Sequence, residues 1–303
     1  MPYFSISGGV PLSGCCRIHG AKNAVLPILA AAVLTRKPVR LLDVPELTDV
    51  SNMCKILRLL GCRVAREGAA LLIDGADADC FALPEDLSKE LRSSIFLLGP
   101  VLGRFRQAVV TYPGGCEIGN RPIDLHLKGL SALQAQIVEE GGRIRCDGGS
   151  LTGATIHLDY PSVGATENIM MAATAADGET VIKNAAREPE IVDLQSFLNA
   201  AGFSVRGAGS STVVIRGGCE PREVSVRIMP DRIVTGTVLA AAAITGGSVT
   251  VENVCPEHLS GTLAKLEEAG CALTLYDRAI RLAAPDRLHA SSRLETMPHP
   301  GCP

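Results

Sequence analysis

Residues 20–42 decide the fold, and they read GAKNAVLPILAAAVLTRKPVRLL. An Ala-rich apolar segment, residues 24–34, is followed by a short β-branched run at residues 39–42. A membrane-spanning helix needs roughly 20 apolar residues, so this 11-residue run with Pro27 inside it is too short to cross a bilayer. We therefore expect a helix followed by a strand, and no association with a membrane.

The same order of features returns three more times along the chain. The apolar segments begin near Gly20, Arg92, Gly164 and Arg232, at separations of 72, 72 and 68 residues. Each is followed by a strand, an amphipathic segment and a pair of short strands, so the order β-α-β-α-β-β repeats with a period of about 70 residues. The strands after the apolar segments are expected at residues 39–42, 108–111, 180–183 and 248–251.

Helical spacing marks the amphipathic segments. Apolar residues recur at positions i, i+3, i+4 and i+7 before Gly61, Gly141, Gly202 and Gly270, and glycine commonly stops a helix. The segments beyond these glycines predict hairpins. The expected pairs are Val64 with 71–73, Ile144 with 155–158, Val205 with 213–215 and Leu273 with 280–282.

Composition excludes several classes of protein. Of 303 residues, 47% are hydrophobic and 20% are charged, which is typical of a packed globular chain. A net charge of -3 and an aromatic content of 3% argue against a nucleic-acid partner, which usually needs a basic face and aromatic side chains for stacking.

The cysteines and the first residues indicate the compartment. Eleven cysteines contain no C-x-x-C pair, and no nearby histidines complete a zinc-finger pattern, so we expect reduced thiols and no metal site. The opening residues, MPYFSIS, have neither a basic region nor a long apolar stretch, so we expect no signal peptide. A cytoplasmic protein is the prediction.

One connection differs from its counterparts. Between the second strand and the helix that follows it, residues 111–124 read TYPGGCEIGNRPID, the longest such connection of the four. Long Gly-rich loops in compact domains often carry function. Cys116 is the single thiol in this loop and is a candidate functional group; the alternative is that it is structural, like the other ten cysteines.

Basic residues stand at the starts of helices, where the helix dipole disfavours cations and favours anions. Lys22, Arg92 and Arg232 occupy such positions. Phosphate is the usual anion at a helix N-terminus. The alternative is a surface cation whose side chain turns away, and for Arg232 a structural pair with Asp231.

Several strings together resemble the family of UDP-N-acetylglucosamine enolpyruvyl transferases, through essentially the whole chain and in order. They are GAKNA at 20–24, PGGCEIG at 113–119, RPIDLH at 121–126, SVGAT at 162–166, NAAREPEIV at 184–192 and PDRI at 230–233. The resemblance implies an α/β fold described as an inside-out α/β barrel of βαβαββ repeats in two domains. Residues 22–229 would be a complete domain of three repeats, and residues 1–21 with 230–303 would be part of a second domain. Substrates would bind between the two.

The reaction implied by the resemblance moves the enolpyruvyl group of phosphoenolpyruvate onto the 3′-hydroxyl of UDP-N-acetylglucosamine and releases phosphate. It opens peptidoglycan precursor synthesis and needs no metal or organic cofactor. Its partners are therefore small-molecule substrates, while the oligomeric state stays open.

The resemblance also assigns roles to residues. Cys116 would be the proton donor, and Glu188 and Glu190 match family acids for which packing is the expected role. Phosphoenolpyruvate would be bound by Lys22, Asn23 and Arg121. UDP-N-acetylglucosamine would be bound by Arg92, Arg121, Pro122, Ile123, Asp124, Leu125, Ser162, Val163 and Gly164.

Two departures from the family pattern modify these expectations. Residues 159–161, Asp-Tyr-Pro, stand where some members carry a lysine, which puts one nucleotide contact in doubt. Six repeats would need about 420 residues, so we expect the chain to lack the family's essential aspartate and further arginines, and to have little activity alone. A non-catalytic remnant, a sugar-nucleotide-binding fragment and a 3-phosphoshikimate 1-carboxyvinyltransferase remain as alternatives.

Overall fold

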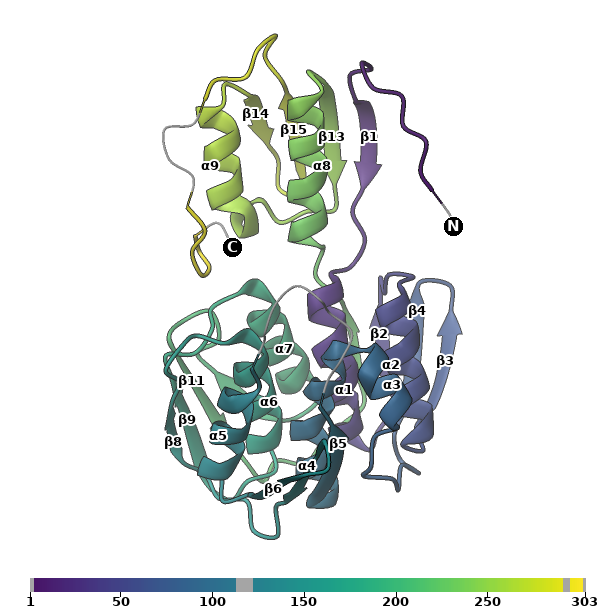
Figure 1. Cartoon of the computed structure of the whole chain (residues 1–303), viewed down its shortest axis with the longest axis vertical. Helices are drawn as coiled ribbons and strands as arrows, with labels where there is room; N and C mark the ends of the chain where they lie inside the picture. Colours follow the sequence, from purple (N-terminus) through teal and green to yellow (C-terminus); the bar gives the residue numbers. More distant parts are fainter. Residues whose placement is uncertain (1–2, 113–121, 291–294, 302–303) are drawn as a thin grey trace. The chain divides into compact units, whose positions relative to one another are not determined.

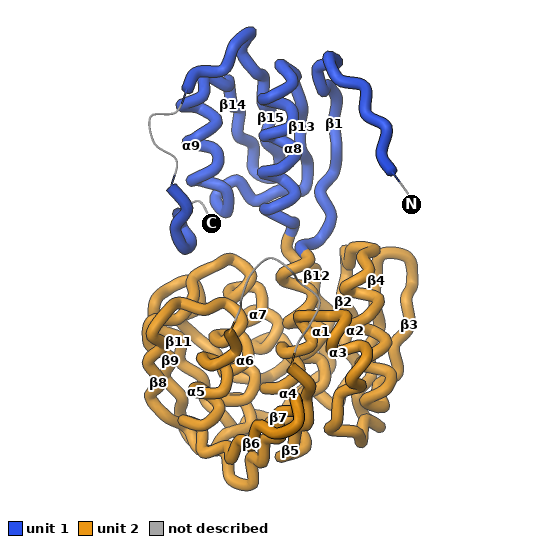
Figure 2. The backbone as a smooth tube through the Cα atoms, in the orientation of Figure 1, with its two compact units in different colours: residues 1–21, 230–303 blue, residues 22–229 orange. Residues whose placement is uncertain are grey.

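The computed structural model describes residues 3–112, 122–290 and 295–301. Within it the chain divides into two compact units (Figure 2). Unit 1 comprises Met1–Ala21 and Pro230–Pro303, and unit 2 comprises Lys22–Met229. Among the described residues, no helix is long and apolar enough to cross a membrane.

Three apolar helices form the interior of unit 2. They are α1 (Lys22–Thr35), α4 (Leu98–Phe105) and α6 (Val163–Ala173), and each contacts the other two. All residues of α1 from Ala24 to Thr35 are buried, because this helix is apolar on every side and packs on every side. The helix expected at residues 24–34 is therefore confirmed.

Three sheets surround these helices. Strands β8, β9 and β11 lie to one side and β2, β3 and β4 to the other (Figure 1). The first sheet has the order β12-β2-β4-β3, with β12 (Val224–Arg227), β2 (Val39–Leu42), β4 (Ala70–Asp74) and β3 (Arg63–Glu67). The second is β10-β11-β9-β8, with β10 (Ser204–Arg206), β11 (Thr212–Arg216), β9 (Glu179–Lys183) and β8 (Thr155–His157). The third is β5-β7-β6, with β5 (Gln107–Thr111), β7 (Arg143–Asp147) and β6 (Gln136–Glu140).

Shorter or amphipathic helices complete unit 2. They are α2 (Thr48–Leu59), α3 (Glu85–Glu90), the 3-10 helix η1 (Arg92–Leu97), α5 (Asp124–Ala132) and α7 (Pro189–Ala200). The α/β class is confirmed, with helices inside and mixed sheets outside. The described strands form separate sheets and no closed barrel.

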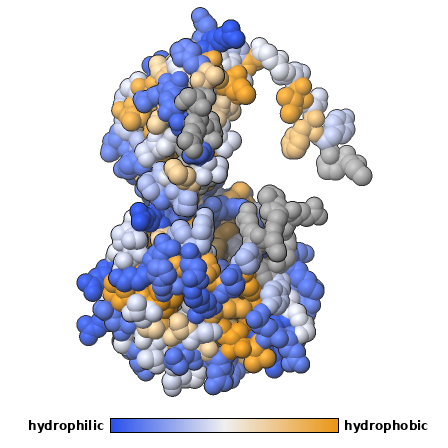
Figure 3. Space-filling view, turned by 60° about the vertical axis from the view of Figure 1, so that its left-hand side comes forward, coloured by the Kyte–Doolittle hydropathy of each residue, from blue (hydrophilic) through white to orange (hydrophobic). Residues whose placement is uncertain are grey.

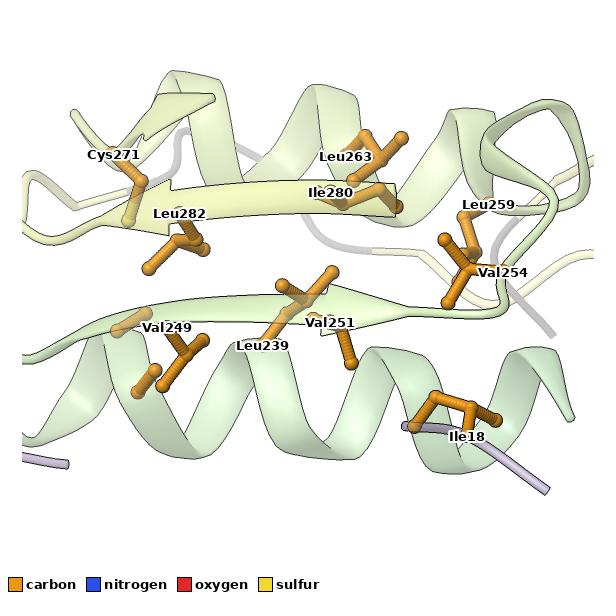
Figure 4. Packing of buried hydrophobic residues seen from close by; sticks show 12 residues of the cluster. Ile18, Leu239, Val249, Val251, Val254, Leu259, Leu263, Cys271, Ile280 and Leu282 are labelled. Atoms are coloured by element: carbon orange, nitrogen blue, oxygen red, sulfur yellow. The ribbon is translucent and has the colours of Figure 1, made fainter. Parts of the chain in front are cut away.

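Unit 1 contains one further copy of the repeat. Its sheet has the order β1-β13-β15-β14, with β1 (Ser13–Arg17), β13 (Ser248–Glu252), β15 (Ala279–Ala283) and β14 (Ala272–Leu275). Helices α8 (Arg232–Ile244), η2 (Pro256–Leu259) and α9 (Ser260–Glu268) accompany it. The core joins Leu239 of α8 to Val251, Ile280 and Leu282 of the sheet and Leu263 of α9 (Figure 4).

Apolar side chains remain exposed in unit 1. Helix α8 is as apolar as α1, yet it buries only Thr235, Leu239, Ala242 and Ala243, and Ile244 is 78% exposed. The segment before β1 is an extended arm, visible in Figure 3, in which Phe4 is 96% exposed. The single copy of the repeat thus covers one face of α8.

The first strands of two repeats are exchanged between the units. Strand β1 directly precedes α1 in the chain, but it pairs in parallel with β13, with Cys16 opposite Val251. Strand β12 directly precedes α8, but it pairs in parallel with β2, with Val226 opposite Leu41. In each unit, therefore, one sheet contains a strand that is followed in the chain by a helix of the other unit.

Most of the expected elements are confirmed. The four strands after the apolar segments are β2, β5, β9 and β13. Gly61, Gly202 and Gly270 have φ angles of 93°, 100° and 92°, which end the preceding helices in the left-handed conformation that glycine tolerates. The hairpins β3–β4, β10–β11 and β14–β15 are formed as expected.

The second repeat differs from the expectation. The helix expected to run to Gly141 is wrong, because α5 ends at Ala132 and Gln134 adopts a φ of 71° that a helix cannot contain. Ile137 lies instead in β6, which turns at residues 141–142 into β7. The hairpin of Ile144 with 155–158 is also wrong, because β7 pairs with β5 and β6 while β8 pairs in parallel with β9.

Candidate functional site

Three segments expected to bind the sugar nucleotide begin helices in unit 2. Arg92 opens η1, Asp124 opens α5, and Val163 opens α6. Ser162 caps α6, because its Oγ accepts a hydrogen bond from the Ala165 N–H at 3.3 Å. These helix starts follow from local sequence, since serine is a favoured cap and each segment precedes an apolar stretch.

The side chain of Asn168 links these three helices and α4. Asn168 lies in α6 and is fully buried. Its Nδ2 donates to the carbonyl of Ile95 in η1 and to Nδ1 of His126 in α5, both at 2.7 Å. Its Oδ1 accepts from the N–H of Gly99 at 2.7 Å. One carboxamide therefore fixes η1, α4 and α5 against α6.

These contacts determine the state of His126. The Ile95 carbonyl can only accept and the Gly99 N–H can only donate, so the orientation of the Asn168 amide is unambiguous. His126 Nδ1 must then accept from Asn168, which leaves the ring proton on Nε2. Burial lowers the pKa of His126 to about 4, with help from the nearby charge of Arg92 and against that of Asp124. The imidazole is thus neutral at pH 7.

Two glycines make this arrangement possible. A Cβ on Gly164 would come within 3.0 Å of His126 Cε1, 3.2 Å of His126 Nε2 and 3.1 Å of Phe96 Cε1. A Cβ on Gly99 would come within 2.3 Å of the Asn168 carbonyl oxygen. Helix α4 therefore approaches α6 more closely than any other residue at position 99 would permit, whereas a side chain at position 164 would require the rings of His126 and Phe96 to shift by a few tenths of an ångström.

Helix α1 begins with two of the three residues expected to bind phosphoenolpyruvate, Lys22 and Asn23. The Lys22 Nζ lies 3.1 Å from Asp49 Oδ2 at the start of α2, with the two side chains 45% and 38% exposed. Asn23 is exposed. A cation at a helix start is thus accompanied by a carboxylate, and both remain open to solvent.

The remaining residues expected to bind the sugar nucleotide differ in how far they are exposed to solvent. Pro122 and Asp124 are exposed, Leu125, Val163 and Gly164 are half-buried, and Ile123 is buried. The candidate proton donor Cys116 and the candidate ligand Arg121 lie outside the described residues. The resemblance-based roles of all these residues stay predictions.

A second ion pair lies beside the capped start of α6. Lys128 Nζ of α5 is 2.5 Å from Asp159 Oδ2, and this contact lowers the pKa of Asp159. Tyr160, in the segment where some family members carry a lysine, is 59% exposed. A cation is therefore present near this segment, but it comes from α5.

Buried acids lie deeper in unit 2. Glu167 is fully buried, and neither of its carboxylate oxygens has a hydrogen-bond partner in the described part of the chain. Burial raises its pKa well above the ordinary value, and the charges of Glu190 and Glu188 add to the shift. Glu188 and Glu190 are 9% and 3% exposed, at the start of α7.

Cavities and metal-binding groups add little to this site. Over the described residues, no group of three or more His, Cys, Asp or Glu side chains could hold a metal. A depression of about 610 Å³ opens over the sheet that contains β2, between Arg40, Arg63 and Asp74. A smaller one of about 280 Å³ lies in unit 1 between Arg232, His258 and neighbouring residues of α8 and α9. The residues that line these two depressions do not include those expected to bind phosphoenolpyruvate or the sugar nucleotide.

Sequence reasoning gave no role to His126, Asn168 or Asp49. His126 lies inside the RPIDLH string, and Asn168 is the last of three consecutive polar residues, Thr166 to Asn168, that precede the apolar residues 169–173 of α6. Polar residues in an apolar helix are usually satisfied by specific partners. Their partners, however, are 42 and more residues away in sequence.

The profile of the EPSP synthase (3-phosphoshikimate 1-carboxyvinyltransferase) family matches residues 6–303. Among solved structures, the enolpyruvyl transferase NikO from Streptomyces tendae superposes with a TM-score of 0.82 at 22% identity, over 93% of this chain and 68% of that one. EPSP synthase from Acinetobacter baumannii gives 0.71 at 21% identity, over 91% and 65%. The chain belongs to the EPSP synthase family of enolpyruvyl (carboxyvinyl) transferases.

Comparison with individual members of the family identifies more similar relatives. UDP-N-acetylglucosamine 1-carboxyvinyltransferase 2 of Caldanaerobacter subterraneus subsp. tengcongensis is 48% identical over all of this chain and 73% of its own length. The UDP-N-acetylglucosamine 1-carboxyvinyltransferase of Gloeobacter violaceus is also 48% identical, over all of this chain and 66% of its own length. The chain thus spans about two thirds to three quarters of the length of these curated relatives.

Proposed function

We propose that this chain carries out, or forms the larger part of a protein that carries out, enolpyruvyl transfer from phosphoenolpyruvate to the 3′-hydroxyl of UDP-N-acetylglucosamine. The observation that carries the proposal is the 48% identity over the full chain with enzymes named for that reaction. The shikimate-phosphate alternative has weaker support, because the solved EPSP synthase is only 21% identical.

The helix starts of unit 2 support a phosphate-bearing ligand. The N–H groups of a helix's first turn have no acceptor within the helix, and the dipole favours an anion there. Arg92 adds a positive charge close enough to His126 to lower the pKa of that imidazole. In this proposal the uridine diphosphate moiety is bound by residues 121–125 together with Ser162, Val163 and Gly164.

The proposed chemistry is an addition followed by an elimination. Cys116 gives a proton to C3 of phosphoenolpyruvate while the sugar oxygen bonds to C2 and the hydroxyl gives its proton to a general base. The C2–O bond to phosphate then breaks, phosphate leaves, and a base takes a proton from C3, which restores the double bond. Lys22, Asn23 and Arg121 hold the carboxylate and phosphate and stabilise the developing charge.

The proposal extends to organisation and location. Residues 22–229 would act as one complete domain of three repeats, and residues 1–21 with 230–303 as part of a second. A cytoplasmic location is proposed because reduced thiols persist in that compartment. Among the described residues, no two cysteines form a disulfide.

Phosphate release tests the reaction directly. The chain is incubated with phosphoenolpyruvate and UDP-N-acetylglucosamine, or with shikimate 3-phosphate in place of the sugar nucleotide. Release that needs the sugar nucleotide and is lost in Cys116→Ser supports the proposal. Release with shikimate 3-phosphate alone would overturn it.

A second assay separates binding from turnover. The epoxide fosfomycin is expected to alkylate Cys116, with the rate changed by UDP-N-acetylglucosamine, and peptide mass spectrometry identifies the thiol. Cys62 and Cys146 are internal controls, because burial raises the pKa of these thiols to about 11 and about 12 and keeps them unreactive. Labelling that is insensitive to the sugar nucleotide would contradict a shared site.

A further inference from the structure

We propose that residues 3–7, the arm strand, dock as an added strand on the free edge of β14 in a second copy of this chain, and that the exchange is reciprocal. The arm strand and β14 both belong to unit 1. The product is a two-fold dimer held by two identical contacts between an arm strand and a sheet edge.

The arm strand has the pattern of a strand that lacks a partner. It reads Tyr-Phe-Ser-Ile-Ser, so Phe4 and Ile6 alternate with serines, as in a strand with one apolar face. Tyr3, Phe4 and Ile6 are 89%, 96% and 87% exposed. Along the described chain the first backbone hydrogen bonds are made at Leu12. An apolar face and a row of backbone groups are therefore open before it.

The edge of β14 is open on one side. Among the described strands, β14 ends the order β1-β13-β15-β14 and pairs with β15 alone. The Tyr276 N–H donates to the Ala279 carbonyl at 2.9 Å, which makes these residues a hydrogen-bonded pair of the hairpin. Because hydrogen-bonded and other pairs alternate along an antiparallel ladder, the N–H and C=O groups of Leu273 and Leu275 point away from β15. They offer four backbone groups to an incoming strand.

The apolar faces of the arm strand and of β14 match. Leu273 packs against the core of unit 1, and Leu275, two residues further and so on the same face, is 54% exposed. The core face of the sheet is thus incompletely covered at this edge. A strand that pairs with β14 and turns Phe4 and Ile6 to this face covers Leu275 and extends the core, while its serines point to solvent.

The arm strand cannot reach the edge of its own sheet. Leu12 is tied to the start of β13, because its carbonyl accepts from the Ser248 N–H at 2.9 Å. The five residue steps from Leu12 back to Ser7 span roughly 17 Å when fully extended. The position beside β14 lies four strand spacings from β1, which is about 19 Å. The strand that docks there therefore comes from a second copy.

The surface involved is as large as a stable dimer needs. Buried aromatic side chains cover about 150–250 Å² each, so Tyr3 and Phe4 together cover roughly 400 Å². In a reciprocal dimer each copy also receives the partner's arm strand on its own edge, which buries a similar area. The sum approaches the approximately 800 Å² that each partner buries in an interface of standard size.

Sedimentation velocity of the full chain at several concentrations tests the proposal. The wild type is expected to be a dimer that dissociates on dilution. Phe4→Glu combined with Ile6→Glu should weaken association at least tenfold, because both charges lie on the face to be buried. Leu275→Pro should weaken it similarly, since proline removes an N–H that points away from β15. Leu275→Lys places a charge on the same face and replaces the proline variant if that variant does not fold.

The serines of the arm strand provide the matched control. Ser5→Glu combined with Ser7→Glu adds the same charge to the same segment, but on the face that points to solvent. This variant should remain a dimer. Because residues 3–7 make no hydrogen bond within the described chain, all arm variants should keep the circular dichroism spectrum of the wild type. Equal weakening by the serine substitutions would show a general effect of charge and would overturn the proposal.

Mixing two variants tests the exchange itself. The Phe4→Glu, Ile6→Glu variant keeps an intact edge, and Leu275→Pro keeps an intact arm strand. Their mixture should therefore form a heterodimer at a concentration where neither variant associates alone. No recovery in the mixture, or a wild type that is monomeric at every concentration, overturns the proposal. So does a dimer that survives these substitutions and is lost in Ile244→Glu, since Ile244 is 78% exposed on α8 and would mark that helix as the interface.

Discussion

His126 and Glu167 are both buried in unit 2, and burial shifts their pKa values in opposite directions. The pKa of His126 falls to about 4 and that of Glu167 rises well above its ordinary value, so each shift favours the neutral side chain. Because the unfolded chain exposes both groups to water, the two residues make opposite contributions to the dependence of stability on pH.

For His126 the stability contribution is lost as pH falls. Between about pH 6.5, the ordinary value, and about pH 4 the unfolded chain binds a proton that the folded protein does not, so the free energy of unfolding rises with pH in this window. The full effect is roughly 3 kcal/mol. Urea titrations at pH 4.5 and 7.5 should show a smaller pH dependence in His126→Gln than in the wild type. An identical dependence would contradict a neutral buried imidazole.

For Glu167 the sign is reversed. Its folded pKa is raised, so the folded protein holds a proton that the unfolded chain releases above about pH 4.5, and stability falls as pH rises. Glu167→Met, which keeps the length of the side chain, should be more stable than the wild type at pH 7.5 and gain less at pH 4.5. Thermal unfolding at the two pH values measures the difference, and greater stability of the wild type at pH 7.5 would refute the expectation.

At this scale the sequence predicts where helices begin better than it predicts the protonation states of buried side chains. The strings containing Lys22, Arg92 and Ser162 indicate helix starts because caps and charges act locally. The neutral form of His126 depends on Asn168, 42 residues later, and on burial that only the packed helices create. No pattern along the chain carries that information.

At the scale of elements, the close approach of α4 to α6 depends on Gly99. A Cβ there would come within 2.3 Å of the Asn168 carbonyl oxygen and 2.7 Å of its Oδ1. Gly99→Ala should therefore force the two helices apart and destabilise the protein by about 2–3 kcal/mol, as overpacking of backbone against backbone does. The midpoint of urea unfolding measures the loss.

Gly236 of α8 is the matched control. A Cβ at this position would meet only Thr262 Cγ2 at 3.6 Å and Leu259 Cδ2 at 3.8 Å, which are ordinary contacts. Gly236→Ala should stabilise the protein by up to about 1 kcal/mol, because alanine is the better helix former. Similar losses in both variants would show that the helix contact is not the cause.

The repeat predicts elements well where burial and periodicity agree. Residues 24–34 form a helix because every side of it packs, and Gly61 stops α2 because glycine accepts a φ of 93°. In the second repeat Leu130, Leu133 and Ile137 also fit a helical spacing, yet Ile137 lies in a strand. Pairing of β6 with β7 overrides the spacing, since short apolar runs fit both periods.

At the scale of the whole molecule, the two units have separate cores. In unit 1, Leu282 is fully buried among side chains of its own unit, including Leu239 and Val251. Leu282→Ala should cost unit 1 about 3 kcal/mol. Hydrogen exchange measured by mass spectrometry should show faster exchange in β13, β15 and α8, and unchanged protection of α1 and α6.

A substitution at Leu198 of α7 tests the core of unit 2 in the same way. It is fully buried in unit 2, so Leu198→Ala should speed exchange in unit 2 and leave β13 and β15 unchanged. Loss of protection in both units from either substitution would show that they unfold as one cooperative structure.

The repeat order could not predict which strand completes which sheet. By sequence alone β1 belongs with the repeat that begins at α1, yet it pairs with β13, and β12 pairs with β2. Strands β1 and β12 are both short, and each pairs in parallel at the edge of a four-stranded sheet. The hydrophobic pattern of such a strand does not specify which of the two sheets it joins. Which sheet each strand joins is determined only by the tertiary structure of the whole chain.

The exchanged strands also set the order in which a nascent chain can fold. Strand β1 leaves the ribosome near the beginning of synthesis, while its partner β13 begins at Ser248. At roughly 5–20 residues per second, β1 waits on the order of 10–50 s with its edge unpaired. Unit 2 receives its last strand, β12, before α8 is made. We therefore expect the middle of the polypeptide to fold first, and its beginning to be taken up only when translation has delivered the far end.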